Sequence, residues 1–262
     1  MALFKKRRKT SSFSSGELQQ TLHKNLEFTA REQYKLLRTN LGFTLPEGQK
    51  CPIIGVTSSM RGEGKSTTSV NLSYVLAESG KKVLLIDGDL RIPSIAKKME
   101  ISAAPGLTDL LMGYDPKQFD EFRTTILDKW YILPAGELPP NPSELLGSHR
   151  MEKLLNALKE VFDYIIIDLP PVNIVSDAAA ISNFVTGMLV VVREGYTEKK
   201  DLERCFRQLR LSGASILGCV MNEAKSGKGS YGRYKKYRYY KYYRYSSYYY
   251  YKSPESSKSK TK

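Results

Sequence analysis

The chain has 262 residues, a formal net charge of +14 and a hydrophobic fraction of 41%. This length suits one large domain or one domain with appendages, and the hydrophobic fraction excludes a wholly disordered chain. The three cysteines, Cys51, Cys205 and Cys219, are odd in number and form no CxxC pair. They argue against a disulfide scaffold and against a structural zinc site, and they are compatible with a reducing cytoplasm.

The positive charge is concentrated at the two ends of the chain. Residues 1–16 contribute +5 and residues 225–262 contribute +11, which leaves −2 for residues 17–224. The nearly neutral body disfavours a uniformly basic nucleic-acid-binding domain, although basic ends can bind polyanions or acidic membrane surfaces. No apolar run approaches the roughly 20 residues of a membrane helix, and none follows the basic start as in a secretory signal. We therefore expect a soluble, intracellular protein.

In chain order, residues 1–16 are basic and rich in serine, and we interpret them as a flexible leader. Apolar spacings near three and four then predict a helix over 17–41, within an N-terminal helical segment that spans 17–45. Short apolar runs and helical segments alternate after it. We expect strands over 53–57, 83–86, 130–133, 164–167, 188–192 and 215–221, and helices over 65–79, 143–162 (capped by Ser143), 177–184 and 198–211.

Strands that are continuous hydrophobic runs between helices are typical of a parallel sheet covered on both faces. Residues 17–224 are therefore predicted to form one three-layer α/β domain. In such folds ligands bind beyond the carboxyl ends of the strands.

Residues 225–262 have a different composition: they contain no Leu, Ile, Val or Phe, and Lys, Arg, Ser and Gly separate their tyrosines. Such a segment has no core to bury, and we expect it to be a disordered tail. Tyrosine among basic residues also suits RNA binding by stacking, but the exclusive use of tyrosine favours a role for the hydroxyl itself. The tail tyrosines are Tyr231, Tyr234, Tyr237, Tyr239, Tyr240, Tyr242, Tyr243, Tyr245, Tyr248, Tyr249, Tyr250 and Tyr251.

The strongest local motif lies between the strand at 53–57 and the helix at 65–79, the context that a phosphate-binding loop of a P-loop NTPase requires. Glycines allow backbone N–H groups to approach phosphates, Lys65 can reach the β- and γ-phosphates, and the Ser66 hydroxyl suits Mg²⁺. Ser59 stands where the strict pattern has glycine; a chance Gly-Lys-Ser at a helix start is the alternative. The candidate ATP-binding residues are Ser59, Met60, Arg61, Gly62, Glu63, Gly64, Lys65, Ser66 and Thr67.

Two apolar strands end in aspartate. The strand at 83–86 leads to Asp87 and Asp89, and the strand at 164–167 leads to Asp168. A carboxylate at such a position lies beside the metal in P-loop enzymes, so Asp168 is a candidate Mg²⁺ partner. Asp87 and Asp89 can bind Mg²⁺ and also accept a proton from a hydroxyl. Arg91 can offset these charges or simply pair with Asp89; each aspartate taken singly could be a solvated turn residue or a helix cap.

These strings resemble the bacterial tyrosine kinases that regulate capsular and extracellular polysaccharide synthesis, in their stand-alone form from Gram-positive bacteria. Residues 57–66 correspond to Walker A, residues 85–93 to Walker A′ and residues 165–171 to Walker B. Residues 134–146 and the tyrosine-rich end are also similar to the family. The resemblance implies a P-loop NTPase fold and ATP-dependent tyrosine autophosphorylation; none of the eukaryotic kinase motifs occurs.

Family roles transfer to matching positions only. The resemblance implies that Lys65, Asp87 and Asp89 are catalytic, with Asp87 favoured over Asp89 as the activator of the tyrosine hydroxyl. It also implies Mg²⁺ ligation by Ser66, Asp87 and Asp168. Asn222, after the last strand, is a candidate adenine contact or merely a turn residue.

The resemblance also implies partners. In the family, the tail of one subunit enters the active site of the next within a ring, supported by a motif matched here by Glu32, Lys35 and Arg38. Lys35 replaces the usual arginine and loses its bidentate fork. A membrane-embedded polysaccharide co-polymerase is expected to activate the kinase at the inner face of the cell membrane, and a cognate tyrosine phosphatase to reverse the reaction.

Two alternatives remain. The related septum-site and chromosome-partition ATPases use nucleotide for dimerisation, but they carry a signature lysine where this chain has Met60. A nucleic-acid-binding module acting through the basic aromatic tail would show strongly salt-dependent binding; we expect no specific nucleic acid.

Overall fold

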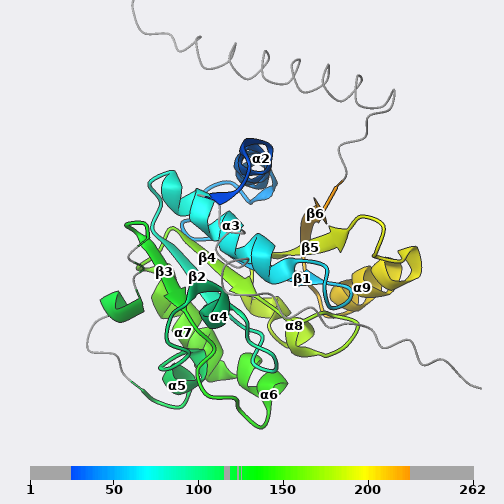
Figure 1. Cartoon of the computed structure of the whole chain (residues 1–262). Helices are drawn as coiled ribbons and strands as arrows, with labels where there is room; N and C mark the ends of the chain where they lie inside the picture. The colour runs from blue at the N-terminus through cyan, green and yellow to red at the C-terminus, as the bar shows by residue number, and fades with distance from the viewer. Residues whose placement is uncertain (1–24, 115–118, 123, 125, 225–262) are drawn as a thin grey trace, which may run out of the picture. The chain divides into compact units, whose positions relative to one another are not determined.

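The computed structural model describes residues 25–114, 119–122, 124 and 126–224. In this part of the chain six parallel strands form one sheet in the order β3-β2-β4-β1-β5-β6 (Figure 1). The predicted α/β class with a parallel sheet is confirmed. The strands are β1 Ile53–Ser58, β2 Val83–Asp87, β3 Trp130–Leu133, β4 Tyr164–Asp168, β5 Gly187–Arg193 and β6 Ile216–Asn222.

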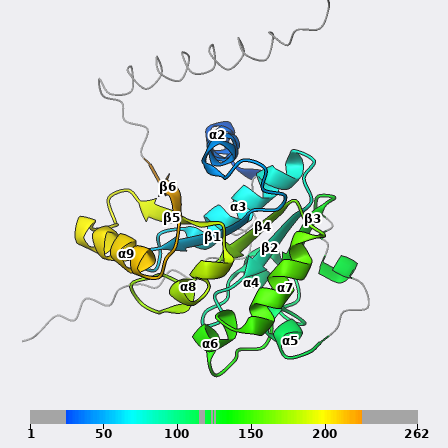
Figure 2. The ribbon, with the colours of Figure 1, turned by 180° about the vertical axis from the view of Figure 1, so that it is seen from behind.

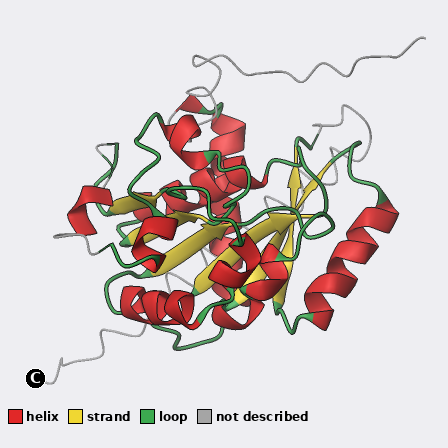
Figure 3. Ribbon diagram, turned by 90° about the horizontal axis from the view of Figure 1, so that it is seen from below, coloured by secondary structure: helices red, strands yellow, loops and turns green. Residues whose placement is uncertain are grey.

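Helices cover both faces of this sheet (Figures 2 and 3). Successive residues of a strand point to opposite faces, and the two hydrophobic cores follow that alternation. Ile53 packs in the core that contains residues of α7 and α9, while Ile54 packs in the core that contains residues of α2 and α3. The helices are α2 Phe28–Thr44, α3 Lys65–Glu78, α4 Ile95–Met99, α5 Leu107–Leu111, α6 Pro142–Leu146, α7 His149–Lys159, α8 Asp177–Ala180 and α9 Lys199–Leu211, with 3₁₀ turns η2 Phe119–Phe122 and η3 Ser182–Phe184.

The register of the central strands brings the motifs together. Val56 of β1 and Asp87 of β2 both pair with Asp168 of β4. Because the strands are parallel, their carboxyl ends meet at one edge, which is where the loop before α3 also begins. The sheet order therefore brings together three motifs that are spread over more than 100 residues of the sequence.

The helix predicted over 143–162 was wrong in one respect: the structure has two helices there. Pro142 occupies the first turn of α6, and α6 ends at Gly147. A separate cap, Ser148, accepts a hydrogen bond from the Met151 amide and starts α7. Ser143 is therefore not a helix cap; its hydroxyl donates to Asp177 instead.

The short elements α4, α5 and η2 were not predicted, since four or five residues are too few to show a period of 3.6. The segment predicted over 177–184 contains α8 followed by η3. The leader at 1–16, the start of the segment at 17–24 and the tail at 225–262 lie outside the described residues. No helix in the described part is long and apolar enough to cross a bilayer.

Candidate active site

The loop between β1 and α3 has the backbone of a phosphate-binding loop. Gly62 and Gly64 have φ angles of +82° and +92°, which side-chain-bearing residues rarely adopt. A Cβ at Gly64 would also lie 2.0 Å from the Asn222 amide nitrogen, so only glycine fits there. The long helix α3 starts at Lys65 and presents its N-terminal N–H groups at the end of this loop. Its dipole favours an anion at that position.

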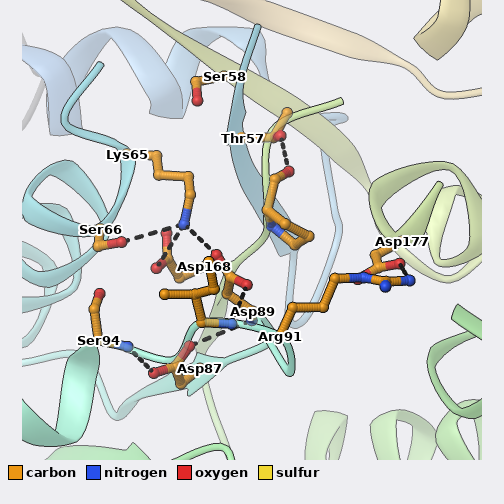
Figure 4. Close-up of polar contacts among 12 residues, drawn as sticks. Thr57, Ser58, Lys65, Ser66, Asp87, Asp89, Arg91, Ser94, Asp168 and Asp177 are labelled. Carbon is orange, nitrogen blue, oxygen red and sulfur yellow. Dashed lines mark hydrogen bonds and ion pairs between the residues drawn. The ribbon is translucent and has the colours of Figure 1, made fainter. Parts of the chain in front are cut away.

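The Lys65 ammonium group lies beside the carboxylates of Asp89 and Asp168 (Figure 4). Its Nζ is 2.9 Å from Oδ2 of Asp89, 3.6 Å from Oδ2 of Asp168 and 3.3 Å from the Ser66 hydroxyl oxygen. The side chains of Lys65, Asp89 and Asp168 are only 13%, 8% and 0% exposed. Burial alone would lower the pKa of Lys65, but the charges of Asp168 and Asp89 hold it above its usual value. The ammonium is therefore charged and positioned beside the loop.

Asp87 is fully buried and held by the start of α4. Its Oδ2 accepts hydrogen bonds from the amides of Ser94 (3.0 Å) and Ile95 (2.9 Å), and its Oδ1 accepts one from the amide of Asp89 (3.3 Å). Burial, and then the charge of Asp168, raise the pKa of Asp87 to about 7, although the Ile95 amide opposes the shift. The carboxylate is fixed in orientation by backbone donors that cannot move independently of the fold.

Asp168 has one satisfied oxygen and one available oxygen. Its Oδ1 accepts a hydrogen bond from the Ser69 hydroxyl at 3.0 Å, while the buried Oδ2 has no hydrogen-bond partner. Burial raises the pKa of Asp168, and the charge of Lys65 opposes this shift. Lys65 Nζ lies 3.6 Å from this oxygen, so the ion pair leaves its hydrogen-bonding capacity unused, and a buried oxygen without a hydrogen bond costs free energy unless a ligand satisfies it. A cation beside Ser66 and Asp168 would do so.

The donor set fits Mg²⁺. In the described residues no group of three or more His, Cys, Asp or Glu side chains has the arrangement of a protein-only metal site. Mg²⁺ prefers oxygen ligands and is commonly held by one or two carboxylates together with phosphate oxygens and water. The hydroxyl of Ser66 and the free oxygen of Asp168 are ligands of this kind, next to a loop suited to phosphates.

The sequence allowed an ion pair between Arg91 and Asp89, but the structure does not contain it. The Nε and Nη2 of Arg91 bind the two carboxylate oxygens of the fully buried Asp177 at 2.9 and 3.0 Å, as Figure 4 shows. The Ser143 hydroxyl also donates to Asp177. Both Asp89 oxygens have other partners, since Oδ2 accepts from Lys65 and Oδ1 accepts from the Ile92 amide. The Asp177 partner was missed because nothing local marks an aspartate 86 residues away.

Asn222 lies at the end of β6, beside the phosphate-binding loop. Its amide nitrogen donates to the Glu63 carbonyl at 3.0 Å. Two neighbouring contacts were not predicted: Arg193 donates to the Gly62 carbonyl and the Tyr196 hydroxyl donates to the Arg61 carbonyl, both at 3.0 Å. Sequence reasoning gave no signal for these residues, since arginine and tyrosine after a strand are ordinary surface residues.

The three residues of the expected oligomerisation motif make contacts within the chain. Lys35 and Glu32 form an ion pair at 2.8 Å, and Arg38 donates to the Val75 carbonyl of α3 at 2.8 Å. Tyr34, on the same helix, is partly buried against the core that contains α3, and desolvation raises the pKa of its hydroxyl. The Glu32–Lys35 pair lies within α2, whereas Arg38 and Tyr34 hold α2 on α3, the helix that follows the phosphate-binding loop.

Comparison with known proteins identifies the relatives of this arrangement. The profile of a family described as an AAA domain matches residues 51–197. The tyrosine-protein kinase CpsD of Streptococcus agalactiae is 36% identical over 201 residues, which cover 76% of this chain and 85% of that protein. The tyrosine-protein kinase YwqD of Bacillus subtilis is also 36% identical, over 76% of this chain and 83% of that protein.

Solved structures give the same picture. The chimerical protein CapA2B2 superposes with a TM-score of 0.69 at 33% identity, covering 74% of this chain and 84% of that one. The kinase domain of the Escherichia coli tyrosine kinase ETK has a TM-score of 0.66 at 32% identity, covering 76% and 78%. The septum-site-determining protein MinD of Pyrococcus horikoshii, complexed with Mg-ADP, has 0.55 at 25%, covering 68% and 72%. The P-loop NTPase fold is thus confirmed, and the septum-site alternative is the weaker match.

Proposed function

The chain belongs to the family of bacterial tyrosine-protein kinases, and we propose that it transfers the γ-phosphoryl group of ATP to tyrosine hydroxyls of its own tail. The observation that carries the proposal is the convergence of Lys65 with three buried aspartates at one edge of the sheet. Phosphoryl transfer requires mainly positioning and charge neutralisation, and this cluster supplies both. The enzyme class expected from the sequence is the class named for the relatives.

In this proposal residues 59–67 bind the triphosphate, and Lys65 neutralises charge on the β- and γ-phosphates. Ser66 and Asp168 would hold Mg²⁺, with Asp87 as a further acidic group nearby. Bound Mg²⁺ supplies charge stabilisation at the phosphate oxygens. Asp89 orients Lys65 through the 2.9 Å ion pair.

Asp87 receives the proton of the substrate. As the phenol oxygen bonds to the γ-phosphorus, the bond from that phosphorus to the bridging oxygen of ADP breaks, and the phenol proton passes to the Asp87 carboxylate. The amides of Ser94 and Ile95 keep this carboxylate in one orientation. A general base held in this way loses little entropy in reaching the reactive geometry.

The proposed acceptors are the twelve tail tyrosines, presented in trans within a homo-oligomeric ring to which Glu32, Lys35 and Arg38 contribute. Each phosphate adds about −1.5 to −2 charge, so roughly six or seven would cancel the +11 of residues 225–262. Phosphorylation would therefore act as a graded charge switch. Titration of phosphate number against assembly tests this idea, and a flat response contradicts it.

The proposed setting is the cytoplasmic face of the cell membrane. There a membrane-embedded co-polymerase of capsular or extracellular polysaccharide would recruit and activate the kinase, and a tyrosine phosphatase would reset it. This part of the proposal rests on the family resemblance. Five basic residues at 5–9 could add attraction to anionic lipid, about 1 kcal/mol per residue near the surface.

The test is incubation of the full chain with Mg-ATP and the cytoplasmic segment of its activator, followed by mass spectrometry of the tail. We expect phosphate on tail tyrosines of the wild type and none in the Lys65→Met variant. A chain that ends at Lys225 lacks the twelve tail tyrosines. It should still bind nucleotide, but it should gain no phosphotyrosine. An unmodified wild-type tail in the presence of the activator would refute the kinase proposal.

A further inference from the structure

Three consecutive carbonyls of the phosphate-binding loop are each held from outside by a different side chain. The Tyr196 hydroxyl donates to the carbonyl of Arg61, Arg193 Nη1 donates to that of Gly62, and Asn222 Nδ2 donates to that of Glu63, each at 3.0 Å. Arg193 ends β5, Asn222 ends β6, and Tyr196 lies in the loop before α9. We call these three donors the carbonyl clasp.

The clasp determines where the amides of the loop point. In a trans peptide the C=O of one residue and the N–H of the next point in opposite directions. Carbonyls of residues 61–63 that face outward therefore turn the amides of residues 62–64 toward the inside of the loop. Successive N–H groups in such a loop form a concave anion-binding nest. The side chains of the clasp thus act on phosphate through the backbone, without touching it.

The side chain of Glu63 strengthens the same connection. It is fully buried, and one of its oxygens accepts hydrogen bonds from the hydroxyls of Ser59 (2.8 Å) and Thr197. The other oxygen accepts the amide of Met60 at 2.9 Å. The segment before α9 therefore reaches the loop through Thr197 as well as through the clasp. The carboxylate therefore ties two residues of the loop, Ser59 and Met60, to Thr197.

Arg193 and Tyr196 support one another. The guanidinium of Arg193 lies 5.2 Å from the centre of the Tyr196 ring, which is within the range of a cation–π contact. Tyr196 is nevertheless 52% exposed, so its ring contributes little to the hydrophobic core. Loss of its hydroxyl should therefore alter the loop much more than the stability of the fold.

We propose that Arg193, Tyr196 and Asn222 are positioning residues that hold the phosphate-binding amides in their binding orientation before the nucleotide arrives. The inference rests on the proposed function only in requiring a nucleotide phosphate as ligand. It gives Asn222, a candidate adenine contact or turn residue from the sequence, a different role, because its amide nitrogen donates to the Glu63 carbonyl. Preorganised amides bind without a reorganisation cost, which raises affinity.

The experiment measures equilibrium binding of a fluorescent ADP analogue with Mg²⁺ to the full chain, together with thermal unfolding. Tyr196→Phe removes one neutral hydrogen bond and should raise Kd about three- to tenfold. Arg193→Met removes a charged donor and should raise Kd more, about tenfold or above. Tyr114→Phe is the matched control, because Tyr114 is also exposed and its hydroxyl contacts Glu121. The Kd of this variant for the analogue should equal that of the wild type.

Displacement of the analogue by inorganic pyrophosphate separates the clasp from an adenine contact. If the clasp acts through the phosphate nest, Asn222→Ala weakens pyrophosphate and ADP by a similar factor. Unchanged pyrophosphate affinity with weakened ADP would overturn the proposal and assign Asn222 to the base. Unchanged ADP affinity in both Tyr196→Phe and Arg193→Met would also overturn it. None of these readings requires phosphoryl transfer, so they remain distinct from a failure of the kinase proposal.

Discussion

The amino ends and the carboxyl ends of the strands form two opposite sides of the sheet, which we call the amino edge and the carboxyl edge. Each carries an ion pair of similar length, one exposed to solvent and the other buried. At the amino edge Lys50 and Glu160 form an ion pair of 2.7 Å with side chains 73% and 71% exposed. At the carboxyl edge Lys65 and Asp89 form a pair of 2.9 Å with side chains 13% and 8% exposed. An exposed pair is screened by water and contributes little, whereas a buried charge without its partner is costly. Burial, more than pairing, distinguishes the candidate active site.

A hollow at the amino edge shows the same contrast. It is lined by residues 42–43, 45–50 and 52, and by Lys81, Asp163 and Tyr164. One of its two acidic residues, Asp163, accepts a hydrogen bond from the Lys82 amide at 2.7 Å and so supports the turn before β2. In contrast to Asp168, this carboxylate has a structural partner in the backbone. A hollow with charged residues is therefore insufficient to indicate chemistry.

The largest expected effect comes from removing the central cation of the buried edge. Lys65→Met should lower tyrosine phosphorylation by at least about a thousandfold, since both phosphate neutralisation and the partner of two buried carboxylates are lost. Quantitative mass spectrometry of the tail measures the rate. The same substitution at the exposed edge, Lys50→Met, should leave the rate unchanged. Similar losses in the two variants would remove the distinction between the edges.

The next effect concerns the proton acceptor. Asp87→Asn retains an oxygen for the Ser94 and Ile95 amides but cannot take a proton, so the transfer rate should fall about 10²- to 10⁴-fold. Nucleotide affinity should change less than about threefold, because the carboxylate acts on the acceptor. Single-turnover kinetics and analogue binding give the two values. Glu160→Gln is the exposed control, and a rate for Asp87→Asn within threefold of wild type would exclude Asp87 as the base.

A third prediction tests burial through stability. Arg91→Met leaves the fully buried Asp177 without its cationic partner and should lower the free energy of unfolding by about 2 kcal/mol. Lys50→Met breaks an exposed pair and should change it by less than about 0.5 kcal/mol. Urea unfolding of both variants at neutral pH supplies the comparison. Equal stability changes would show that burial does not set the value of these pairs.

The smallest effect is a pH dependence at the amino edge. Burial raises the pKa of the Cys51 thiol to about 11, against about 8.5 in an unfolded chain. A raised pKa means that the stabilising contribution is complete below about pH 8.5 and is lost as the pH rises toward 11. By pH 9.5 the free energy of unfolding has fallen by about 1 kcal/mol from this cause. Urea midpoints between pH 7.5 and 10 should fall more steeply for wild type than for Cys51→Ala; parallel slopes would contradict this.

Local features of the molecule could be predicted from the sequence. Hydrophobic runs located all six strands to within two residues, and the Gly-Lys-Ser string located the loop before α3. Asp87 and Asp168 could be placed at strand ends because each directly follows a buried hydrophobic run, and each is the last residue of its strand. These features depend on periodicity and steric preference over a few residues, and such information is written in neighbouring positions.

Partners across long sequence distances were decided by the tertiary structure. The sheet order β3-β2-β4-β1-β5-β6 brings β6 to the side of β5, and so places Asn222 on a carbonyl 159 residues away. It also places Asp89 within ion-pair distance of Lys65, and Asp177 within ion-pair distance of Arg91. A charged or amide side chain has many chemically equivalent partners in a sequence, and only the packed arrangement of strand ends selects one by distance and burial. The sequence by itself thus determined the parts of the candidate site, while folding determined which parts bind one another.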